Sequence, residues 1–316
     1  MMKRIKSLTF ELFARLRKAL SGSGLSKLPG TSFLYNLFYK ILRPHGIISI
    51  ECLGNRLLVN AEDEGIVPYL LTEGIYEPPV TFLFNVLIKP GMTVLDVGAN
   101  IGYFTLVAAK RVGENGRVFA FEPEPHNYNL LVQNIEFNHC ANVTALPIAL
   151  SDEQGQLLLY LHRTNLGCHS ISKENVHSEG GCTRVEATTL DSFISNLGDH
   201  RVDLIKMDIQ GAEGLLIKGG EETLRRDGLA IIMEFWPKGL RQVGTDPSEL
   251  LRKLVELGFQ IKVICGEGAE LAEGTDLTST PEAWKAIMSD SVSLSLLLEK
   301  TGQSISAEMP DGNSRS

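Results

Sequence analysis

The sequence has no long hydrophobic run, little proline and few cysteines. No stretch approaches the ~20 consecutive apolar residues of a membrane-spanning helix, so we expect no transmembrane segment. The 13 prolines among 316 residues, with 43% hydrophobic residues, argue against a disordered or fibrous chain. Five cysteines, an odd number in a chain without a secretory signal pattern, predict reduced thiols. One sizeable α/β core with appendages is therefore expected.

Basic residues are scarce outside the first twenty positions. The formal net charge is −8, although residues 1–20 carry six basic side chains and one glutamate. An acidic body argues against nucleic acid as a partner, because phosphate binding requires a basic surface. Apolar residues at helical spacing in the basic segment leave two interpretations open: a solvated helix that rests on the domain, or peripheral contact with an anionic membrane. We expect a cytoplasmic protein, peripheral to the membrane in the second case.

The pattern divides the chain into four expected segments. They are a basic amphipathic helix and linker (1–24), N-terminal helices and a hairpin (25–89), the main domain (90–300) and a loose polar tail (301–316). In the second segment, Gly54-Asn55 is the predicted hairpin turn. In the main domain, short apolar runs alternate with helical patterns at 103–112, 125–138, 213–226 and 247–257. This alternation predicts a mostly parallel sheet with helices on both faces.

The stretch VLDVGANIGYFT, residues 94–105, leads from an apolar run through a glycine turn into a helical pattern. Small residues let the backbone approach a ligand, and the N–H groups of a helix start favour a negative group, which indicates a nucleotide-like cofactor. The spacing G-A-N-I-G differs from the G-x-G-x-x-G of dinucleotide sites. Asp96 suits an ammonium, such as that of S-adenosylmethionine, better than a pyrophosphate. A turn that serves only tight packing is the alternative.

Two further carboxylates follow the next apolar runs. Glu122 ends the run FAFEP, about where an acid binds ribose hydroxyls in nucleotide sites. Asp152 ends ALSD and is assigned near the adenine, with a turn that closes onto Gly155 as the alternative. Ligands of such sheets bind at the carboxyl ends of the strands, so we expect these residues at one site.

Five stretches in this order closely resemble the FkbM family of S-adenosylmethionine-dependent methyltransferases. They are TEGIYEP (72–78), LDVGANIGYFTLVAAK (95–110), GRVFAFEPEPHNYNLLVQNIEFN (116–138), ALSD (149–152) and DLIKMDIQGAE (203–213). The resemblance implies the Rossmann-like class I methyltransferase fold: a seven-stranded, mostly parallel sheet whose last strand runs antiparallel. SLSLLLEK at 293–300 is the candidate for that strand.

The resemblance also implies roles and an activity. Gly98, Asn100 and Gly102 match the family's cofactor loop, and Glu122 matches its ribose-binding acid. The implied reaction is methylation of a hydroxyl on a sugar, a glycan or a secondary metabolite, so a small molecule or glycan is the expected partner. The sequence departs from the family in MEFWPKGL, where many members have a histidine in place of Phe235-Trp236.

DLIKMDIQGAE supplies the candidates for chemistry at the acceptor. We expect Asp208 beside the methyl group, at the carboxyl end of the fourth strand, where a base can remove the hydroxyl proton. Glu213 opens the next helix, and helix capping is the alternative role for both residues. Glu234 ends the fifth strand on the same rim. Two rim carboxylates can also hold Mg²⁺, so the sequence leaves base and metal open.

A histidine- and cysteine-containing loop precedes this motif. Its residues are His162, Cys168, His169, His177 and Cys182, without a C-x-x-C pair or closely spaced histidines. We therefore assign no metal here and expect a mobile, substrate-facing loop instead of a zinc site. His169 is a secondary candidate base, since its ordinary pKa lies near neutrality.

Three functions from different classes follow. An O-methyltransferase agrees with all the motifs. A nucleotide-binding oxidoreductase on a similar sheet is the second, although the sequence lacks its G-x-G-x-x-G turn. The third is a catalytically silent, membrane-associated module that binds S-adenosylmethionine without turnover.

Overall fold

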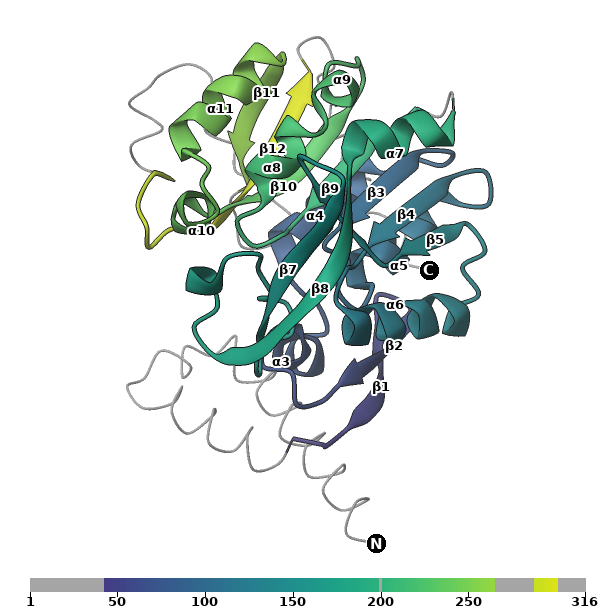
Figure 1. Ribbon diagram of the computed structural model, residues 1–316. Coiled ribbons are helices and arrows are strands. Elements are labelled where there is room, and N and C mark those ends of the chain that lie inside the picture. Colours follow the sequence, from purple (N-terminus) through teal and green to yellow (C-terminus); the bar gives the residue numbers. More distant parts are fainter. Residues whose placement is uncertain (1–42, 199–200, 265–286, 301–316) are drawn as a thin grey trace, which may run out of the picture.

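The computed structural model describes residues 43–198, 201–264 and 287–300. The predictions for the basic N-terminal helix and the polar tail fall outside this part of the chain. A central sheet with helices on both sides dominates the described residues (Figure 1). None of the helices within these ranges has the length and hydropathy needed to cross a bilayer.

Seven strands form the central sheet. Their order is β11 (Phe259–Val263), β12 (Leu294–Lys300), β10 (Ala230–Phe235), β9 (Leu204–Met207), β3 (Thr93–Val97), β4 (Arg117–Phe121) and β5 (Val143–Leu146). The last strand, β12, pairs antiparallel with both β10 and β11, and the other pairings are parallel. This confirms the predicted methyltransferase sheet and its antiparallel strand. The chain order reverses between β3 and β9, and open sheets of this kind bind ligands at such a point.

Among the described residues, seven helices connect or flank the strands of this sheet. They are α5 (Tyr103–Val112), α6 (Pro125–Phe137), α7 (Leu190–Leu197), α8 (Glu213–Lys218), α9 (Glu221–Leu224), α10 (Pro237–Gln242) and α11 (Pro247–Glu256). The helical pattern at 213–226 therefore forms two short helices, with a break at Gly219-Gly220. A side chain at Gly219 would collide with the carbonyl oxygen of Ser151, so only glycine fits at this break.

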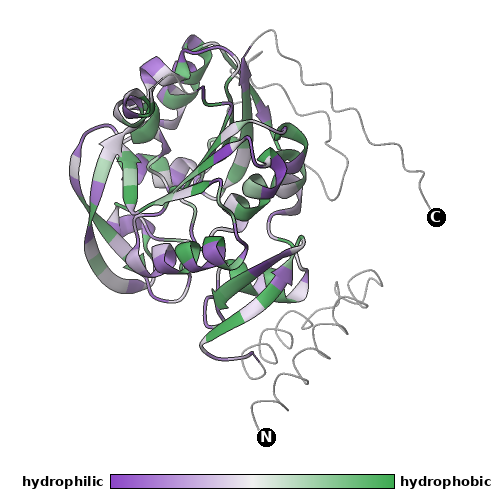
Figure 2. Ribbon diagram, turned by 90° about the vertical axis from the view of Figure 1, so that its right-hand side faces the viewer, coloured by the Kyte–Doolittle hydropathy of each residue, from purple (hydrophilic) through white to green (hydrophobic). Residues whose placement is uncertain are grey.

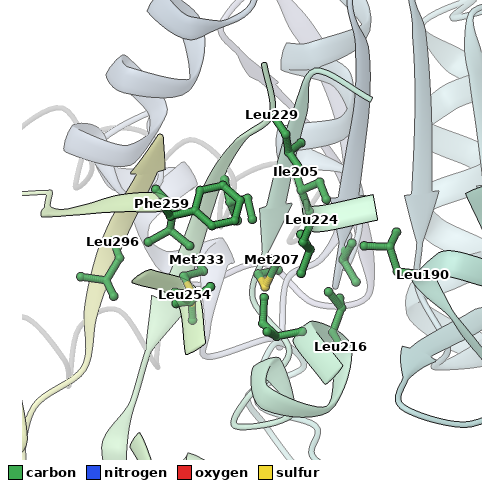
Figure 3. Packing of buried hydrophobic residues seen from close by; sticks show 14 of the residues in the cluster. Leu190, Ile205, Met207, Leu216, Leu224, Leu229, Met233, Leu254, Phe259 and Leu296 are labelled. Atoms are coloured by element: carbon green, nitrogen blue, oxygen red, sulfur yellow. The ribbon is translucent and has the colours of Figure 1, made fainter. Parts of the chain in front are cut away.

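Alternate residues of each central strand face opposite layers of the molecule. In β3, Leu95 and Val97 join a core cluster with residues of α7, α8 and α11, whereas Val94 joins a second cluster with α5. Figure 3 shows part of the first cluster, where Met207 and Met233 meet leucines of the covering helices. The outer helices carry both hydrophilic and hydrophobic residues (Figure 2), as amphipathic surface helices do.

A hairpin and two helices precede the central sheet and complete the second face. The hairpin pairs β1 (Ile47–Cys52) with β2 (Asn55–Asn60), and α3 (Ile66–Thr72) and α4 (Pro78–Leu87) follow. Its turn is Leu53-Gly54, one residue earlier than the predicted Gly54-Asn55. Leu53 and Gly54 both have positive φ, at 50° and 72°, as a two-residue type I′ turn requires, while Asn55 already pairs with Cys52.

A three-stranded sheet stands beside the central one, in the order β6 (Ile148–Ser151), β8 (Glu179–Thr189), β7 (Gly155–His162). The sequence pattern does not predict this second sheet, because the apolar stretch NVTALPIAL (142–150) resembles one continuous strand. Pro147 divides this run between β5 and β6, since proline lacks the N–H group that a continuous ladder needs. The long β7–β8 pair extends past the edge of the central sheet (Figure 1).

Candidate active site

A cavity of about 490 Å³ opens at the carboxyl ends of β3, β4 and β9. It lies at the reversal in strand order, where the fold is expected to bind a ligand. Its lining includes the glycine turn after β3, Glu122 and apolar residues of the three-stranded sheet. The start of α4, Lys206, Asp208 and the loop between β7 and β8 line the same cavity.

The glycine turn follows β3 directly and adopts a conformation that favours small residues. Gly98 and Gly102 have φ of 78° and 93°, and Asn100 also has a positive φ, at 50°. A side chain at Gly98 would collide with the carbonyl oxygen of Asp208, so this glycine lets the turns after β3 and β9 meet. All three residues predicted for the cofactor loop thus lie in one turn, and Gly98 and Asn100 line the cavity.

Glu122, directly after β4, faces the same cavity. Its Oε2 accepts a hydrogen bond from the backbone N–H of Asn100 at 2.8 Å, and its Oε1 accepts one from Glu124 N at 2.9 Å. Burial raises the pKa of Glu122 to about 8, although the two backbone donors favour the ionised form. Each carboxylate oxygen can accept a further hydrogen bond, so the side chain can receive two hydroxyl groups.

Asp96 lies behind the cavity wall, within the sheet. It is fully buried, its Oδ2 accepts a hydrogen bond from Thr105 Oγ1 at 2.6 Å, and it is not one of the residues that line the cavity. Burial raises the pKa of Asp96, and the positive charge of Lys206 opposes this effect. The structure therefore places Asp96 inside the sheet, behind the residues that line the cavity, and its contact with the ammonium stays a prediction.

Asp152 points away from the cavity. Its Oδ2 lies 2.7 Å from Lys218 Nζ, and this ion pair lowers the pKa of Asp152. Ser151, the preceding residue, lines the cavity, whereas Asp152 does not. All four residues of β6 line the cavity, and Asp152 follows that strand with its carboxylate paired to Lys218. A contact of Asp152 with the adenine stays a prediction.

Asp208 follows the last residue of β9 and lines the same cavity. Its Oδ1 accepts a hydrogen bond from Gln210 Nε2 at 2.7 Å, and its Oδ2 lies 3.6 Å from Lys206 Nζ. Burial acts to lower the pKa of Lys206, but Asp208, Asp96 and Glu77 together raise it, so the lysine stays charged. One oxygen of Asp208 therefore faces a buried cation, and the other accepts from an amide.

Glu234, near the end of β10, is joined to Asp208 through the same glutamine. Its Oε2 accepts from Gln210 Nε2 at 2.9 Å, and its Oε1 accepts from Ser293 Oγ at 2.7 Å. Burial, then the negative charges of Asp208 and Glu213, raises the pKa of Glu234 well above its usual range. The two rim carboxylates predicted from the sequence therefore do lie together, with a side-chain amide between them.

Glu213, the first residue of α8, has a different position from Asp208. It is fully buried, and its Oε1 accepts a hydrogen bond from Ile209 N at 3.0 Å. Burial raises the pKa of Glu213 to about 7. The side chain does not line the cavity, and α8 has no side-chain cap; Glu213 instead holds the backbone of the turn that leads into this helix.

His169 does line the cavity, but one of its ring nitrogens already accepts a hydrogen bond and the other carries the proton of the ring. Its Nδ1 accepts a hydrogen bond from His162 N at 3.0 Å, so the neutral ring carries its proton on Nε2. Burial lowers the pKa of His169 to about 4. In this arrangement neither nitrogen is free to accept the proton of a hydroxyl, and Asp208 is the better placed base.

The loop around His169 covers the cavity, as expected for a substrate-facing segment. The side-chain Oδ1 of Asp63 accepts from Leu166 N at 2.9 Å, and Asn127 Nδ2 donates to Leu166 O at 2.8 Å. Segments before α3 and at the start of α6 thus hold the loop from two sides. Within the described ranges, no group of three His, Cys, Asp or Glu side chains is arranged to hold a metal ion.

Glu77 is a site residue that the sequence reasoning missed. It precedes α4 with a left-handed φ of 43°, lines the cavity, and has a pKa raised by burial and then by Asp208. Tyr76 beside it also lines the cavity. Both stand in the stretch TEGIYEP, which contributed only to the family resemblance, because nothing in its local pattern indicates that α4 starts beside β9.

Phe235 and Trp236, where the sequence departs from its family, do not line this cavity. Phe235 is fully buried in the first core cluster. Trp236 instead packs against Gly239 in α10, where a side chain on the glycine would collide with the indole ring. The departure therefore affects the packing around α10 and leaves the described walls of the cavity unchanged.

Comparison with known proteins agrees with this geometry. The family model described as the methyltransferase FkbM domain matches residues 96–261. Methyltransferase sdnD of Sordaria araneosa is 31% identical over 47% of this chain and 68% of its own. The 2-O-methyltransferase NoeI of Sinorhizobium fredii is 29% identical over 49% of this chain and 70% of its own. A solved FkbM methyltransferase from Methylobacillus flagellatus superposes with a TM-score of 0.42 and 14% identity, over 74% of this chain and 52% of that one. The chain therefore belongs to the FkbM family of methyltransferases, which take their methyl group from S-adenosylmethionine.

Proposed function

We propose that the chain is an O-methyltransferase that acts on a hydroxyl of a sugar, glycan or secondary metabolite, with Asp208 as the base. The observation that carries this proposal is that Glu122 and Asp208, from different strand ends, line one cavity. We place the cofactor at a first end of this cavity, beside Glu122, and the acceptor at a second end, beside Asp208. A relative named as a 2-O-methyltransferase, 29% identical, supports oxygen as the atom that is methylated.

The residues of the first end fit S-adenosylmethionine. Glu122 offers two carboxylate oxygens to the ribose hydroxyls, and Phe121, Ile148 and Leu150 give the adenine an apolar wall. The turn of Gly98 and Asn100 leaves room for the methionine part, because it brings backbone close to the cavity. When bound, S-adenosylmethionine supplies an electrophilic methyl group on a sulfonium.

The residues of the second end fit a hydroxyl nucleophile. Asp208 is fixed by Gln210 on one oxygen and by Lys206 on the other, so its orientation does not depend on the acceptor. The hydroxyl oxygen attacks the methyl carbon, and Asp208 accepts the proton that this oxygen loses. Positioning supplies most of the acceleration for a displacement with a good leaving group, and the base adds to it.

The test is a screen for methyl transfer with the purified full chain. S-adenosylmethionine carrying a ¹³C-labelled methyl group is offered with a panel of sugars, glycans and hydroxylated metabolites, and products are read by mass spectrometry and NMR. We expect a product labelled on oxygen. Label on nitrogen or carbon would contradict the proposal, and cofactor binding without any product would favour the silent binding module.

A further inference from the structure

One side-chain amide connects the two carboxylates at the acceptor end of the cavity. We propose that Gln210 is a positioning residue that keeps Asp208 available as a metal-free base, because its Nε2 fills the place where a divalent cation would bridge Asp208 and Glu234. This inference takes its catalytic meaning from the proposed O-methyl transfer at the same site.

The direction of the amide follows from its partners. Nε2 lies 2.7 Å from Asp208 Oδ1 and 2.9 Å from Glu234 Oε2, and each of its two N–H groups can donate to one carboxylate. The opposite orientation would turn the amide oxygen, which carries no proton, toward two oxygens that accept hydrogen bonds. In the observed orientation one neutral group donates to both Asp208 and Glu234.

The amide occupies the position that a bridging cation would take. Nε2 lies within hydrogen-bond distance of one oxygen of each carboxylate. A cation bound to the same two oxygens would lie between them, at roughly 2.0–2.1 Å from each in the case of Mg²⁺. A bridging cation would thus require the departure of Nε2.

The main chain of Gln210 is held in place from a different part of the fold. Its φ of 52° is unusual for a residue with a side chain. Ser170 Oγ donates to its carbonyl oxygen at 2.8 Å, and Asn175 Nδ2 donates to the same oxygen at 3.1 Å. Both side chains are buried and belong to the loop between β7 and β8. The loop that covers the cavity therefore also fixes the amide that positions the base.

The outer oxygens of the two carboxylates have partners too. Asp208 Oδ2 faces Lys206, and Glu234 Oε1 accepts from Ser293. Rotation of either carboxylate toward a cation would break one of these contacts. Replacement of the amide by a third carboxylate would reverse the preference, because three acidic groups repel each other and a divalent cation relieves that repulsion.

The experiment measures Mn²⁺ binding by electron paramagnetic resonance, with the metal alone as the probe and no methyl acceptor. Gln210→Glu is compared with wild type and with a matched control, Gln156→Glu. Gln156 Nε2 also donates to a carboxylate, Glu186 Oε1, at 2.7 Å, but on the exposed surface of β7 and β8. We expect Gln210→Glu to bind one Mn²⁺ at least tenfold more tightly than either other protein, and Asp208→Asn added to it to abolish this binding.

Two results of that titration would overturn the inference. One is equal Mn²⁺ affinity for Gln210→Glu and Gln156→Glu; the other is saturable binding by wild type that Asp208→Asn removes. Since no acceptor is present, failure here leaves the methyl-transfer screen unaffected, and failure of the screen leaves this result standing.

A second measurement needs no folded Gln210→Glu protein. In wild type, the Gln210 side-chain amide signals, assigned by their loss in Gln210→Met, should be protected from exchange. Stoichiometric Mn²⁺ should leave them sharp. Fast exchange, or broadening by Mn²⁺, would contradict the proposed role of the amide.

Discussion

The carboxylate of Glu122 accepts a hydrogen bond of 2.8 Å from the backbone N–H of Asn100, which ties the end of β4 to the glycine turn after β3. A second bond, from Glu124 N, holds the other oxygen. The side chain is therefore fixed toward the cavity before any ligand binds. Two consecutive strand ends form one preorganised surface for a cofactor, and the acid does not need to reorient on binding.

Replacement of Glu122 tests this surface. Glu122→Ala should weaken S-adenosylmethionine binding by about 1–3 kcal/mol, the usual effect of leaving a buried hydrogen-bond donor without its acceptor. Asp152→Ala is the matched control, because its carboxylate also follows a strand but pairs with Lys218 outside the cavity. Calorimetry should show unchanged affinity for the control. Equal affinities for both variants and wild type would refute the ribose assignment.

The hydrogen bond between the buried side chains of Thr105 and Asp96 should contribute to stability. Thr105→Val removes the hydroxyl that donates to Asp96 Oδ2 at 2.6 Å and should lower the free energy of unfolding by about 1–3 kcal/mol. Thr223→Val is the control, since the buried Thr223 Oγ1 has no hydrogen-bond partner among the described residues. Urea denaturation should show little loss, or a gain, for that variant. A larger loss at Thr223 than at Thr105 would contradict the assignment.

The lowered pKa of His169 predicts how the stability of the protein depends on pH. Its pKa falls from an ordinary 6.5 to about 4 through burial, so between these values the unfolded chain binds a proton that the folded chain does not. Stability from this group therefore rises with pH from 4 to 6.5. Glu122 and Glu213, whose pKa values burial raises to about 8 and about 7, act in the opposite direction over their own range. A difference between two proteins is needed to separate these effects.

His169→Asn supplies that difference, because its Oδ1 can replace Nδ1 as the acceptor without titrating. The free energy of unfolding of wild type relative to this variant should rise by up to about 3 kcal/mol between pH 4 and 6.5 and then stay level. Chemical denaturation across that range measures it. Parallel curves for the two proteins would show that His169 does not titrate with folding.

The sequence predicted those parts of the fold that depend on local patterns. Residues 103–112 have a helical pattern after a glycine turn, and α5 has the same bounds. The family resemblance, and not a local pattern, predicted an antiparallel strand at SLSLLLEK, which β12 confirms. Local patterns did not predict the three-stranded sheet, because β7 and β8 pair through contacts between distant residues and β6 begins directly after Pro147.

The candidate site was predictable where it follows strand ends and less so where it depends on tertiary contacts. Glu122 and Asp208 face the cavity because the carboxyl ends of parallel strands share an edge of the sheet. Asp96 is two residues before the level of Glu122 and Asp208 in the sheet and therefore lies inside it. The role of Glu77 required knowledge that α4 begins beside β9, and that of Gln210 required knowledge that its amide contacts carboxylates of two strands.

Asp208→Asn gives the most direct test of the proposed chemistry. Asparagine has nearly the shape of aspartate but is a far weaker base, so the variant should keep its fold and its affinity for S-adenosylmethionine. Once the acceptor screen has supplied a substrate, single-turnover methyl transfer should slow by about 10²- to 10⁴-fold, the usual contribution of a general base. Near-normal methyl transfer by the folded Asp208→Asn protein, with unchanged cofactor affinity, would contradict the central claim that Asp208 takes the proton of the acceptor hydroxyl.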